Sequence, residues 1–294
     1  MQGGHASVLL AESLEILAVK PGGLYVDGTV GLGGHAAAIL ERSGPGGRLV
    51  GLDRDAEVLE RARERLLPFG ARARLLHADY REIPRLLGGE RPDGVLLDLG
   101  VSSVQLDEPE RGFSFRLEGP LDMRMDRSGG ETAAEVVNRA SEPDLAGLIY
   151  RFGEERASRR IARAIVAARR QARIRTTAEL AAIVRRAAGR SRRPGLDPAT
   201  RTFQALRIHV NRELEGLGRA LFDAAECLAP RGRLAVIAFH SLEDREVKRA
   251  FRELGRGGFT VLTRRPLRPA AGEIAANPRS RSARLRGLER AEAA

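Results

Sequence analysis

Short apolar runs alternate with amphipathic segments over the first hundred residues of the chain. Four apolar runs have the length and composition of buried strands, at residues 23–27, 48–53, 73–77 and 94–98. Between them, residues 34–42 and 56–67 repeat their apolar positions with the period of an α-helix. This β-α-β-α-β order predicts a parallel sheet, whose ligands bind beyond the carboxyl ends of the strands. Three of the four runs end in aspartate: Asp27, Asp53 and Asp98.

The pattern changes in the middle of the chain. From about residue 106 to 200 the strand-like runs disappear, and the segments 143–152, 155–170 and 177–188 have helical patterns instead. Alternation then returns, with a helix predicted at 203–228, a strand at 234–239, a helix at 242–254 and a last strand at 259–263. We therefore predict an α/β fold with a Rossmann-like, doubly wound sheet domain made of residues 1–105 and 201–294, and an inserted helical domain at 106–200.

The chain is strongly basic, with a formal net charge of +11 and a pI near 11.0. This charge favours a polyanionic partner such as nucleic acid, because basic side chains that meet phosphates release condensed counterions. An acidic membrane would fit equally well, and a codon bias toward arginine is an alternative explanation, since Lys20 and Lys248 are the only lysines. The tail 279–294 carries five arginines and two glutamates. We expect it to be either a solvated end or an arm on nucleic acid.

No stretch approaches the roughly 18 apolar residues of a membrane span, and the first residues lack the pattern of a secretory signal. We therefore expect a cytoplasmic protein without a membrane partner. The single cysteine, Cys227, lies in a helical pattern, and the five histidines show no paired ligand spacing. The sequence thus predicts no metal site.

A glycine-rich loop, Asp27-Gly28-Thr29-Val30-Gly31-Leu32-Gly33-Gly34-His35, joins the first strand to the first helix. Glycines allow a sharp turn and a close approach to a ligand, and Asp53 can accept hydrogen bonds from ribose hydroxyls. The loop also fits a loose dinucleotide fingerprint, so a nicotinamide oxidoreductase is one alternative. Asp27 favours S-adenosylmethionine, because a carboxylate there suits an amino group and would repel a pyrophosphate. Asp79 and Tyr80 offer an acid and an aromatic face to adenine.

Polar and glycine residues follow the fourth strand directly, in the block from Asp98 to Asp126. Such residues are costly in a core and useful in a site. Asp98 is placed to accept a hydrogen bond from a target amine and to orient the lone pair of its nitrogen. Phe113 and Phe115 are candidates for stacking on a nucleobase, although both can equally be core residues.

Several long motifs together resemble one family, the ribosomal RNA small-subunit methyltransferase H family, also called MraW. The resemblance runs over almost the whole chain and rests on the loop 27–35, the block 98–126 and five further segments. These segments are His5-x-x-Val8-Leu-Leu-x-Glu12, Phe152-Gly-Glu-Glu-Arg156, Ala199-Thr-Arg-Thr-Phe-Gln-Ala-Leu-Arg-Ile208, Phe239-His-Ser-Leu-Glu-Asp-Arg245 and Asn277-Pro-Arg-Ser-Arg-Ser282.

The resemblance implies a class I S-adenosylmethionine-dependent methyltransferase fold and methylation of the N4 amine of a decoding-region cytidine in small-subunit (16S) ribosomal RNA. A non-catalytic RNA-binding assembly factor is a further alternative. Whether the substrate is naked RNA or the assembled small subunit, and whether the chain acts as a homodimer, stay open. Carried over by motif, the cofactor contacts are Gly33, Gly34, His35, Asp53, Tyr80, Asp98 and Gln105. Our reading of the loop and of the third strand adds Asp27, Gly31 and Asp79.

We expect Asp98 and His240 to be the catalytic residues. His240 follows a predicted strand and has three candidate roles: it can relay the released proton, bind phosphate, or cap the next helix. In the inserted domain, Arg156, Arg159, Arg160 and Arg163 are candidates for holding the RNA backbone, and a solvated helix face is the alternative.

Overall fold

The structure is a computed structural model that describes residues 7–189 and 197–292. The chain folds into two compact units. The first, which we call the sheet unit, consists of the residues up to Gly100 and from Leu214 onward, and the second, the helical unit, consists of Val101–Glu213. Residues 101–105 and 201–213, assigned to the sheet domain from the sequence, therefore belong to the helical unit.

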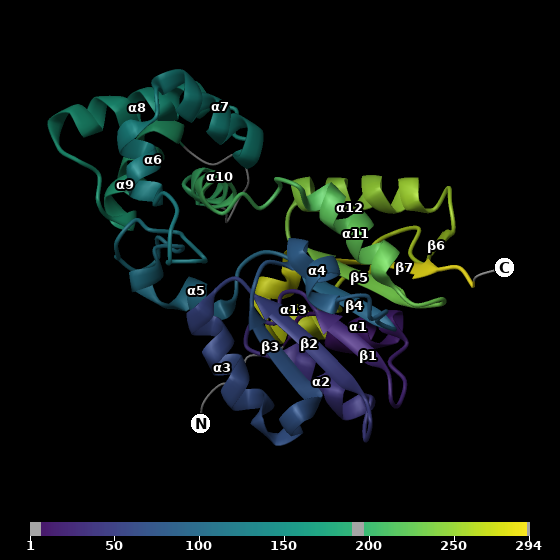
Figure 1. Cartoon of the computed structure of the whole chain (residues 1–294). Helices are drawn as coiled ribbons and strands as arrows, with labels where there is room; N and C mark the ends of the chain where they lie inside the picture. The colour runs from purple at the N-terminus through teal and green to yellow at the C-terminus, as the bar shows by residue number, and fades with distance from the viewer. Residues whose placement is uncertain (1–6, 190–196, 293–294) are drawn as a thin grey trace. The chain divides into compact units, whose positions relative to one another are not determined.

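A seven-stranded sheet forms the centre of the sheet unit, with the strand order β3-β2-β1-β4-β5-β7-β6 (Figure 1). The first five strands in this order run parallel, and β7 is antiparallel to both of its neighbours. The strands are β1 (Leu24–Asp27), β2 (Arg48–Asp53), β3 (Ala73–His77), β4 (Gly94–Asp98), β5 (Arg233–Ala238), β6 (Phe259–Val261) and β7 (Arg284–Arg290). The strand order reverses between β1 and β4, the place where open α/β sheets bind their ligands.

Helices cover both faces of this sheet, so the doubly wound prediction is confirmed. Leu96 of β4 packs on the face covered by α1 (Leu10–Leu17), α2 (Gly34–Arg42) and α3 (Ala56–Leu66). Its neighbours Val95 and Leu97 pack on the opposite face, against α4 (Ile83–Leu87), α11 (Leu217–Cys227) and α12 (Ser241–Leu254). Because both faces are buried, the strands read as continuous apolar runs. That is why the bounds of β2 and β4 agree with the sequence prediction; those of the edge strand β3 agree as well, although its residues are only partly buried or exposed.

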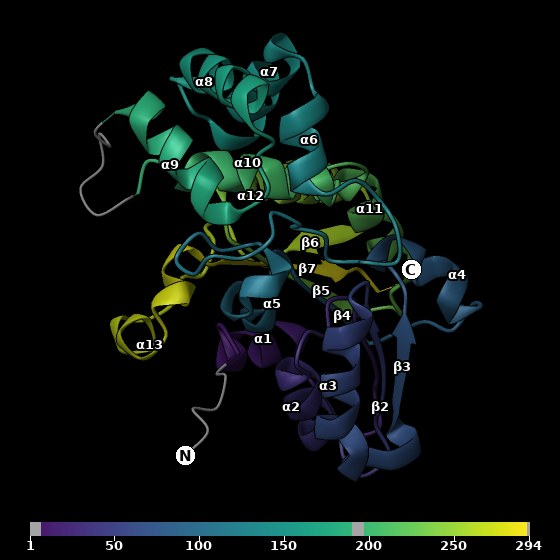
Figure 2. The ribbon, with the colours of Figure 1, turned by 90° about the vertical axis from the view of Figure 1, so that its left-hand side faces the viewer.

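The helical unit has a core of its own, built from five helices (Figure 2). They are α6 (Ala133–Arg139), α7 (Glu142–Gly153), α8 (Ser158–Gln171), α9 (Thr177–Ala188) and α10 (Thr200–Val210). The side chains of Thr132, Ser141 and Thr176 cap the N-termini of α6, α7 and α9, each accepting a backbone N–H of the first turn. The remaining helical elements of the chain are α5 (Ser103–Asp107), α13 (Ala271–Ala276), η1 (Leu67–Arg72), η2 (Tyr80–Glu82), η3 (Pro109–Arg111) and η4 (Pro278–Ser282).

The prediction of a solvated or RNA-bound tail from residue 279 is wrong for most of that segment. Arg284–Arg290 forms β7, which pairs with β5 on one side and β6 on the other. Leu285 and Leu288 are fully buried, on opposite faces of the sheet. The guanidinium groups of Arg284 and Arg286 form ion pairs with Asp244 on α12, at 2.9 and 2.7 Å. This pairing allows an arginine-rich segment to lie inside a sheet.

The single helix predicted at 203–228 is also wrong, because two helices occupy it. The side chain of Asn211 accepts the backbone N–H of Met125 at 2.8 Å and donates to the carbonyl of Met123 at 2.7 Å. The next residue, Arg212, has a positive φ of 49°, and Gly216 has a φ of 70°. These left-handed residues end α10 and start α11 anew.

Within the described ranges, every helix is too short or too polar to cross a lipid bilayer.

We predict that Leu288→Ala lowers the free energy of unfolding by about 2–5 kcal/mol, because the side chain is fully buried in the sheet unit. Ser282→Ala, at an exposed position just before β7, should change it by less than about 0.5 kcal/mol. Urea unfolding of the two variants measures the difference. Equal stabilities would contradict the placement of β7 inside the sheet.

Candidate active site

Three acidic side chains lie together at the carboxyl ends of neighbouring strands. Asp27 ends β1, Asp53 ends β2 on one side of it, and Asp98 ends β4 on the other. The three strands are parallel, so the residues lie at one edge of the sheet. The clustering that the sequence predicts is therefore present. Like charges this close raise the pKa of one another.

Asp27 is buried, with 1% of its surface exposed. Its Oδ1 accepts the backbone N–H of Thr29 at 3.2 Å, and its Oδ2 has no hydrogen-bond partner among the residues that the structure describes. Burial, together with the charge of Asp53, raises the pKa of Asp27 to about 7. A buried carboxylate oxygen without a donor is costly, and a water, an ion or a ligand can complete it.

Asp98 has a similar arrangement. Its Oδ1 is buried and lacks a partner in the described part of the chain, while the side chain as a whole keeps 24% of its exposure. Burial raises the pKa of Asp98 well above its usual range, and the charges of Asp27 and Glu243 raise it further. The other oxygen, Oδ2, lies 3.7 Å from Nδ1 of His35. The edge thus offers two buried acceptor oxygens on adjacent strands. The one on Asp98 belongs to a side chain that is partly exposed to solvent.

His35 is held in place from the other side of its ring. Its Nε2 donates to the carbonyl oxygen of Val8 at 3.0 Å, so that nitrogen carries a proton and Nδ1 is the atom that faces Asp98. His5, which begins the sequence motif that contains Val8, lies outside the described residues.

Side chains at the sheet edge shape the glycine loop. The backbone N–H of Gly31 donates to Oδ2 of Asp53 at 2.9 Å, and the N–H of Asp98 donates to Oγ1 of Thr29 at 2.6 Å. Gly31 and Gly33 have φ angles of +53° and +77°, which side chains with a Cβ rarely adopt. A Cβ at Gly34, the first residue of α2, would overlap Oγ of Ser7. Gly31 and Gly33 are therefore needed for the path of the loop itself, whereas at Gly34 the Ser7 hydroxyl would have to rotate away.

Asp53 and Asp79 already accept backbone hydrogen bonds. Oδ1 of Asp53 accepts the N–H of Asp55 at 2.9 Å, in addition to the bond from Gly31, and burial raises its pKa to about 6. Asp79 caps η2 and forms an ion pair with Arg81 at 2.8 Å. Each carboxylate oxygen has a second lone pair, so both can still accept a ligand hydroxyl. Tyr80 follows Asp79 and lies under the guanidinium of Arg81.

Of its three predicted roles, the structure gives His240 that of a helix cap. Its Nδ1 accepts the backbone N–H of Glu243 at 3.3 Å, and its Nε2 lies 3.2 Å from Oε1 of the same residue. Glu243 in turn accepts the N–H of Phe239 at 2.8 Å and is 2% exposed. Sequence reasoning missed Glu243, although it lies in the motif 239–245 and its charge reaches Asp98.

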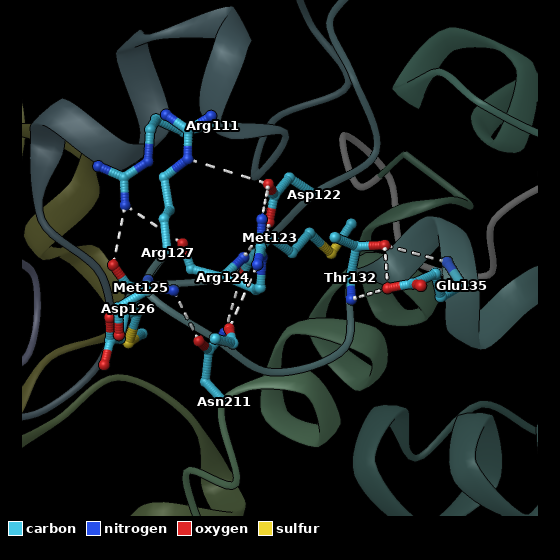
Figure 3. A network of polar contacts seen from close by, with 12 residues as sticks. Arg111, Asp122, Met123, Arg124, Met125, Asp126, Arg127, Thr132, Glu135 and Asn211 are labelled. Carbon is cyan, nitrogen blue, oxygen red and sulfur yellow. Dashed lines mark hydrogen bonds and ion pairs between the residues drawn. The ribbon is translucent and has the colours of Figure 1, made fainter.

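From residue 101 on, the block 98–126 lies in the helical unit, where its polar side chains hold a loop together (Figure 3). Arg111 is 1% exposed and donates to the carbonyl oxygens of Arg124 and Met125 at 3.2 and 3.0 Å. Asp122 accepts from Nε and Nη2 of Arg124 at 2.7 and 2.9 Å. Gln105 is buried in α5, and its Oε1 accepts the N–H of Ser102 at 2.9 Å. In this unit, therefore, much of the motif serves folding.

Phe113 and Phe115 pack with the core of the helical unit. Phe113 is 6% exposed, and the ring of Phe115 meets that of Phe203 edge to face at 4.8 Å. These contacts favour the core role over stacking on a base.

The four candidate arginines near α8 are exposed. Arg160 donates to the carbonyl of Ala188 at 2.7 Å, and Arg163 lies 3.6 Å from Glu142.

Comparison with known proteins gives one family. A model of the MraW methylase family matches residues 2–291. A ribosomal RNA small subunit methyltransferase H from Syntrophus aciditrophicus is 50% identical over 306 aligned residues, covering 97% of both chains. One from Gloeobacter violaceus is 54% identical, covering 96% of this chain and 87% of the relative. Among solved structures, a SAM-dependent O-methyltransferase from Thermotoga maritima aligns with a TM-score of 0.46 at 13% identity, over 100% of this chain and 69% of that one.

We predict that Asp27→Asn makes the protein, without any ligand, more stable at pH 8 than the native chain. Because the folded-state pKa of Asp27 is about 7 and that of an unfolded aspartate is about 3.9, native stability falls as pH rises between these values. The gain from Asp27→Asn should therefore be about 2 kcal/mol larger at pH 8 than at pH 5, as measured by urea unfolding at both pH values.

Glu253→Gln is the control for that experiment, since it neutralises an exposed acid on α12. Its effect on stability should be small at both pH values. A pH-independent effect of Asp27→Asn would mean that Asp27 is ionised freely in the folded protein.

Proposed function

The chain belongs to the MraW methylase family, and from that premise we propose that it methylates the exocyclic N4 amine of a cytidine in the decoding region of small-subunit ribosomal RNA, using S-adenosylmethionine. The relatives' names, small subunit methyltransferase H, support the RNA substrate. The class I methyltransferase fold supports the cofactor. Such a substrate would place the activity in the cytoplasm. The observation that carries the chemistry is the pair of buried, unpartnered oxygens: Oδ2 of Asp27 and Oδ1 of Asp98, among the described residues.

The residues of the sheet edge fit this cofactor. Its amino group is a cationic donor, which suits the unpartnered Oδ2 of Asp27, and its ribose hydroxyls suit the remaining lone pairs of Asp53. Asp79 and Tyr80 lie beyond β3 on the same side and would contact the adenine. The left-handed glycines Gly31 and Gly33, with Gly34 and His35, would form the wall of the site.

Asp98 would hold the amine that is methylated. S-adenosylmethionine supplies an electrophilic methyl group on a sulfonium centre. The N4 amine of cytosine is a weak nucleophile, because its lone pair is delocalised into the ring. A hydrogen bond from the amine to Oδ1 of Asp98 would turn the lone pair out of conjugation and fix its direction, a gain of orientation and local electrostatics. Asp98 would also accept the proton that the methylated amine loses.

For His240 we propose a positioning role in place of proton relay. It holds Glu243 at the start of α12, and the charge of Glu243 raises the pKa of Asp98. A carboxyl group of raised pKa is a stronger proton acceptor once it is ionised. A bound cation beside it would favour that ionised form.

We propose that the helical unit recognises RNA. Along α8, Arg159, Arg163 and Arg170 follow one another at helical spacing and are exposed. Such a row suits a phosphate backbone. The naked RNA and the assembled subunit are both compatible with it.

Two other functions fit the structure less well. A nicotinamide oxidoreductase would place a pyrophosphate beside Asp27, Asp53 and Asp98, which is electrostatically unfavourable. The family that matches this chain is one of methylases, not of oxidoreductases. A non-catalytic RNA-binding assembly factor would need neither of the unpartnered oxygens, yet keeping them costs folding free energy. Both observations favour the methyltransferase.

We predict that the affinity for S-adenosylmethionine falls about tenfold between pH 8 and pH 6. The cofactor binds the ionised form of Asp27, and a pKa of about 7 leaves roughly a tenth of that form at pH 6. Isothermal titration across this range measures the change. Asp27→Asn should bind more weakly and with a flatter pH profile, whereas a constant native affinity would argue against contact between Asp27 and the cofactor.

We predict that Asp98→Asn lowers methyl transfer at least about 100-fold, because the amide is a weaker acceptor and cannot take up the proton. Cofactor and RNA affinities should stay within about threefold of the native values. Transfer of labelled methyl groups to RNA from cells that lack the gene measures the rate.

Asp223→Asn, at a partly exposed acid of α11 that pairs with Arg219, is the control and should be fully active. Mass spectrometry of ribosomal RNA from the same cells should show the loss of one N4-methylated cytidine. If Asp98→Asn restores the cellular function while the modification stays absent, the assembly-factor alternative is favoured.

A further inference from the structure

The segment that follows the edge strand β6 concentrates positive charge. Residues 262–282 contain five arginines and one acid, Glu273, whereas the whole chain has 50 basic and 39 acidic residues. The carboxylate of Glu273 accepts the backbone N–H of Leu9 at 2.9 Å. A codon bias would raise the number of arginines everywhere and would not remove acids from one segment. The concentration therefore calls for a local explanation.

Three of these arginines, Arg264, Arg265 and Arg268, lie in or directly beside a bulge of the sheet edge, whereas Arg279 and Arg281 lie in η4. Leu262 donates its backbone N–H to Gly287, and Leu267 exchanges two backbone hydrogen bonds with Leu285, at 2.9 and 3.0 Å. Four residues, 263–266, therefore lie opposite the single residue Arg286. A bulge of this kind pushes residues out of the ladder, and bulges are common beside active sites. We call Arg264, Arg265 and Arg268 the arginine bulge.

The bulge lies at the same edge of the sheet as Asp98. In the strand register, Asp98 is opposite Ile237 of β5, Ile237 is opposite Leu285 of β7, and Leu285 is bridged to Leu267. Asp98 and Leu267 are thus in one row, three strand spacings apart, or about 14 Å. The separation is short enough for one RNA strand to reach both.

All three side chains of the arginine bulge are exposed. No carboxylate within the described ranges forms an ion pair with any of them, in contrast to Arg284 and Arg286, which both contact Asp244. Arg281 in η4, shortly before β7, is exposed as well. Figure 2 shows α13, which follows the bulge in the chain, as a separate short helix of the sheet unit.

We propose that the arginine bulge binds the phosphate backbone of the RNA strand that carries the target base. The inference rests on the proposed function and adds a contact surface in the sheet unit to the one proposed for the helical unit. The planar guanidinium fork suits phosphate oxygens, and each contact releases counterions. An acidic membrane is disfavoured, because Leu267 is the one large apolar side chain exposed on the bulge, at 39%, and stable attachment needs a wider apolar face.

The test compares two double variants that each remove two positive charges. Arg264→Ala with Arg265→Ala changes the bulge. Arg252→Ala with Arg256→Ala changes two exposed arginines at the end of α12 and just beyond it. The helix α12 starts after the carboxyl end of β5, and β6 follows it in the chain. Thr260 of β6 and Arg233 at the start of β5 are both paired with Glu289 of β7, so β6 lies level with the amino end of β5. The control pair therefore lies toward the opposite edge of the sheet.

The bulge variant should bind small-subunit RNA about tenfold more weakly at 0.15 M salt, and the slope of log affinity against log salt should fall by about 1.4–1.8 for two lost phosphate contacts. Its KM for RNA should rise by a similar factor, while kcat and the affinity for S-adenosylmethionine stay unchanged. The control pair should stay within about twofold of the native protein in every measurement.

Equal losses in the two double variants would overturn the proposal, because net charge alone would then explain them. A native-like bulge variant would overturn it too, as would a loss confined to binding of vesicles that contain phosphatidylserine. Failure of the native protein to methylate small-subunit RNA would instead refute the proposed function, so the two failures can be told apart.

Discussion

The burial of several carboxylates at one edge of a parallel sheet is the constraint on which the rest of this structure depends. Asp27, Asp53 and Asp98 end adjacent strands, and Glu243 adds a fourth acid beyond β5. The charges of Asp27 and Glu243 raise the pKa of Asp98, because a negative charge nearby disfavours its ionised form. Asp53 is compensated by two backbone N–H groups, from Gly31 and Asp55, whereas Asp27 keeps one oxygen without a donor among the described residues. The fold thus keeps an energetically unfavourable carboxylate oxygen at a site that a cationic ligand would complete.

Much of the fold could be predicted from the sequence, because buried strands and amphipathic helices appear in it as apolar patterns with sharp ends. β2, β3, β4, α2 and α9 have the predicted bounds. β7 was missed because its alternating arginines look like a solvated tail, and the acid that neutralises Arg284 and Arg286, Asp244, lies 40 residues before Arg284. The break between α10 and α11 was missed for the same kind of reason, since it depends on hydrogen bonds from Asn211 to a loop 86 residues away.

The candidate site could be predicted where the type of a residue indicates its function. It was not predictable where the function depends on which residue the side chain contacts in the fold. Strand-end aspartates and a glycine loop are read directly from local order, and the structure brings Asp27, Asp53 and Asp98 to one edge. His240 is a different case, because an imidazole after a strand suits proton transfer and helix capping equally well. Its distance to Glu243 favours the cap, and no local pattern encodes that distance. Likewise, Arg111 appears in a polar motif, and only its burial reveals that it holds a loop.

The two signs of charge are separated along a single row of the sheet, and this separation matters for a reaction between a cation and a polyanion. The acids lie at the ends of β1, β2 and β4, and the arginine bulge lies beyond β7 in the row that contains Asp98. Interleaved charges would neutralise one another, as Asp244 does with Arg284 and Arg286. β5 and β7 lie between Asp98 and the bulge, and this spacing of about 14 Å is too long for a direct ion pair. Each group can then act on its own ligand: the carboxylates on a sulfonium donor and an amine, and the arginines on phosphates. The antiparallel strand β7, whose Arg284 and Arg286 pair with Asp244, therefore separates the two groups of charge in space as well as extending the sheet.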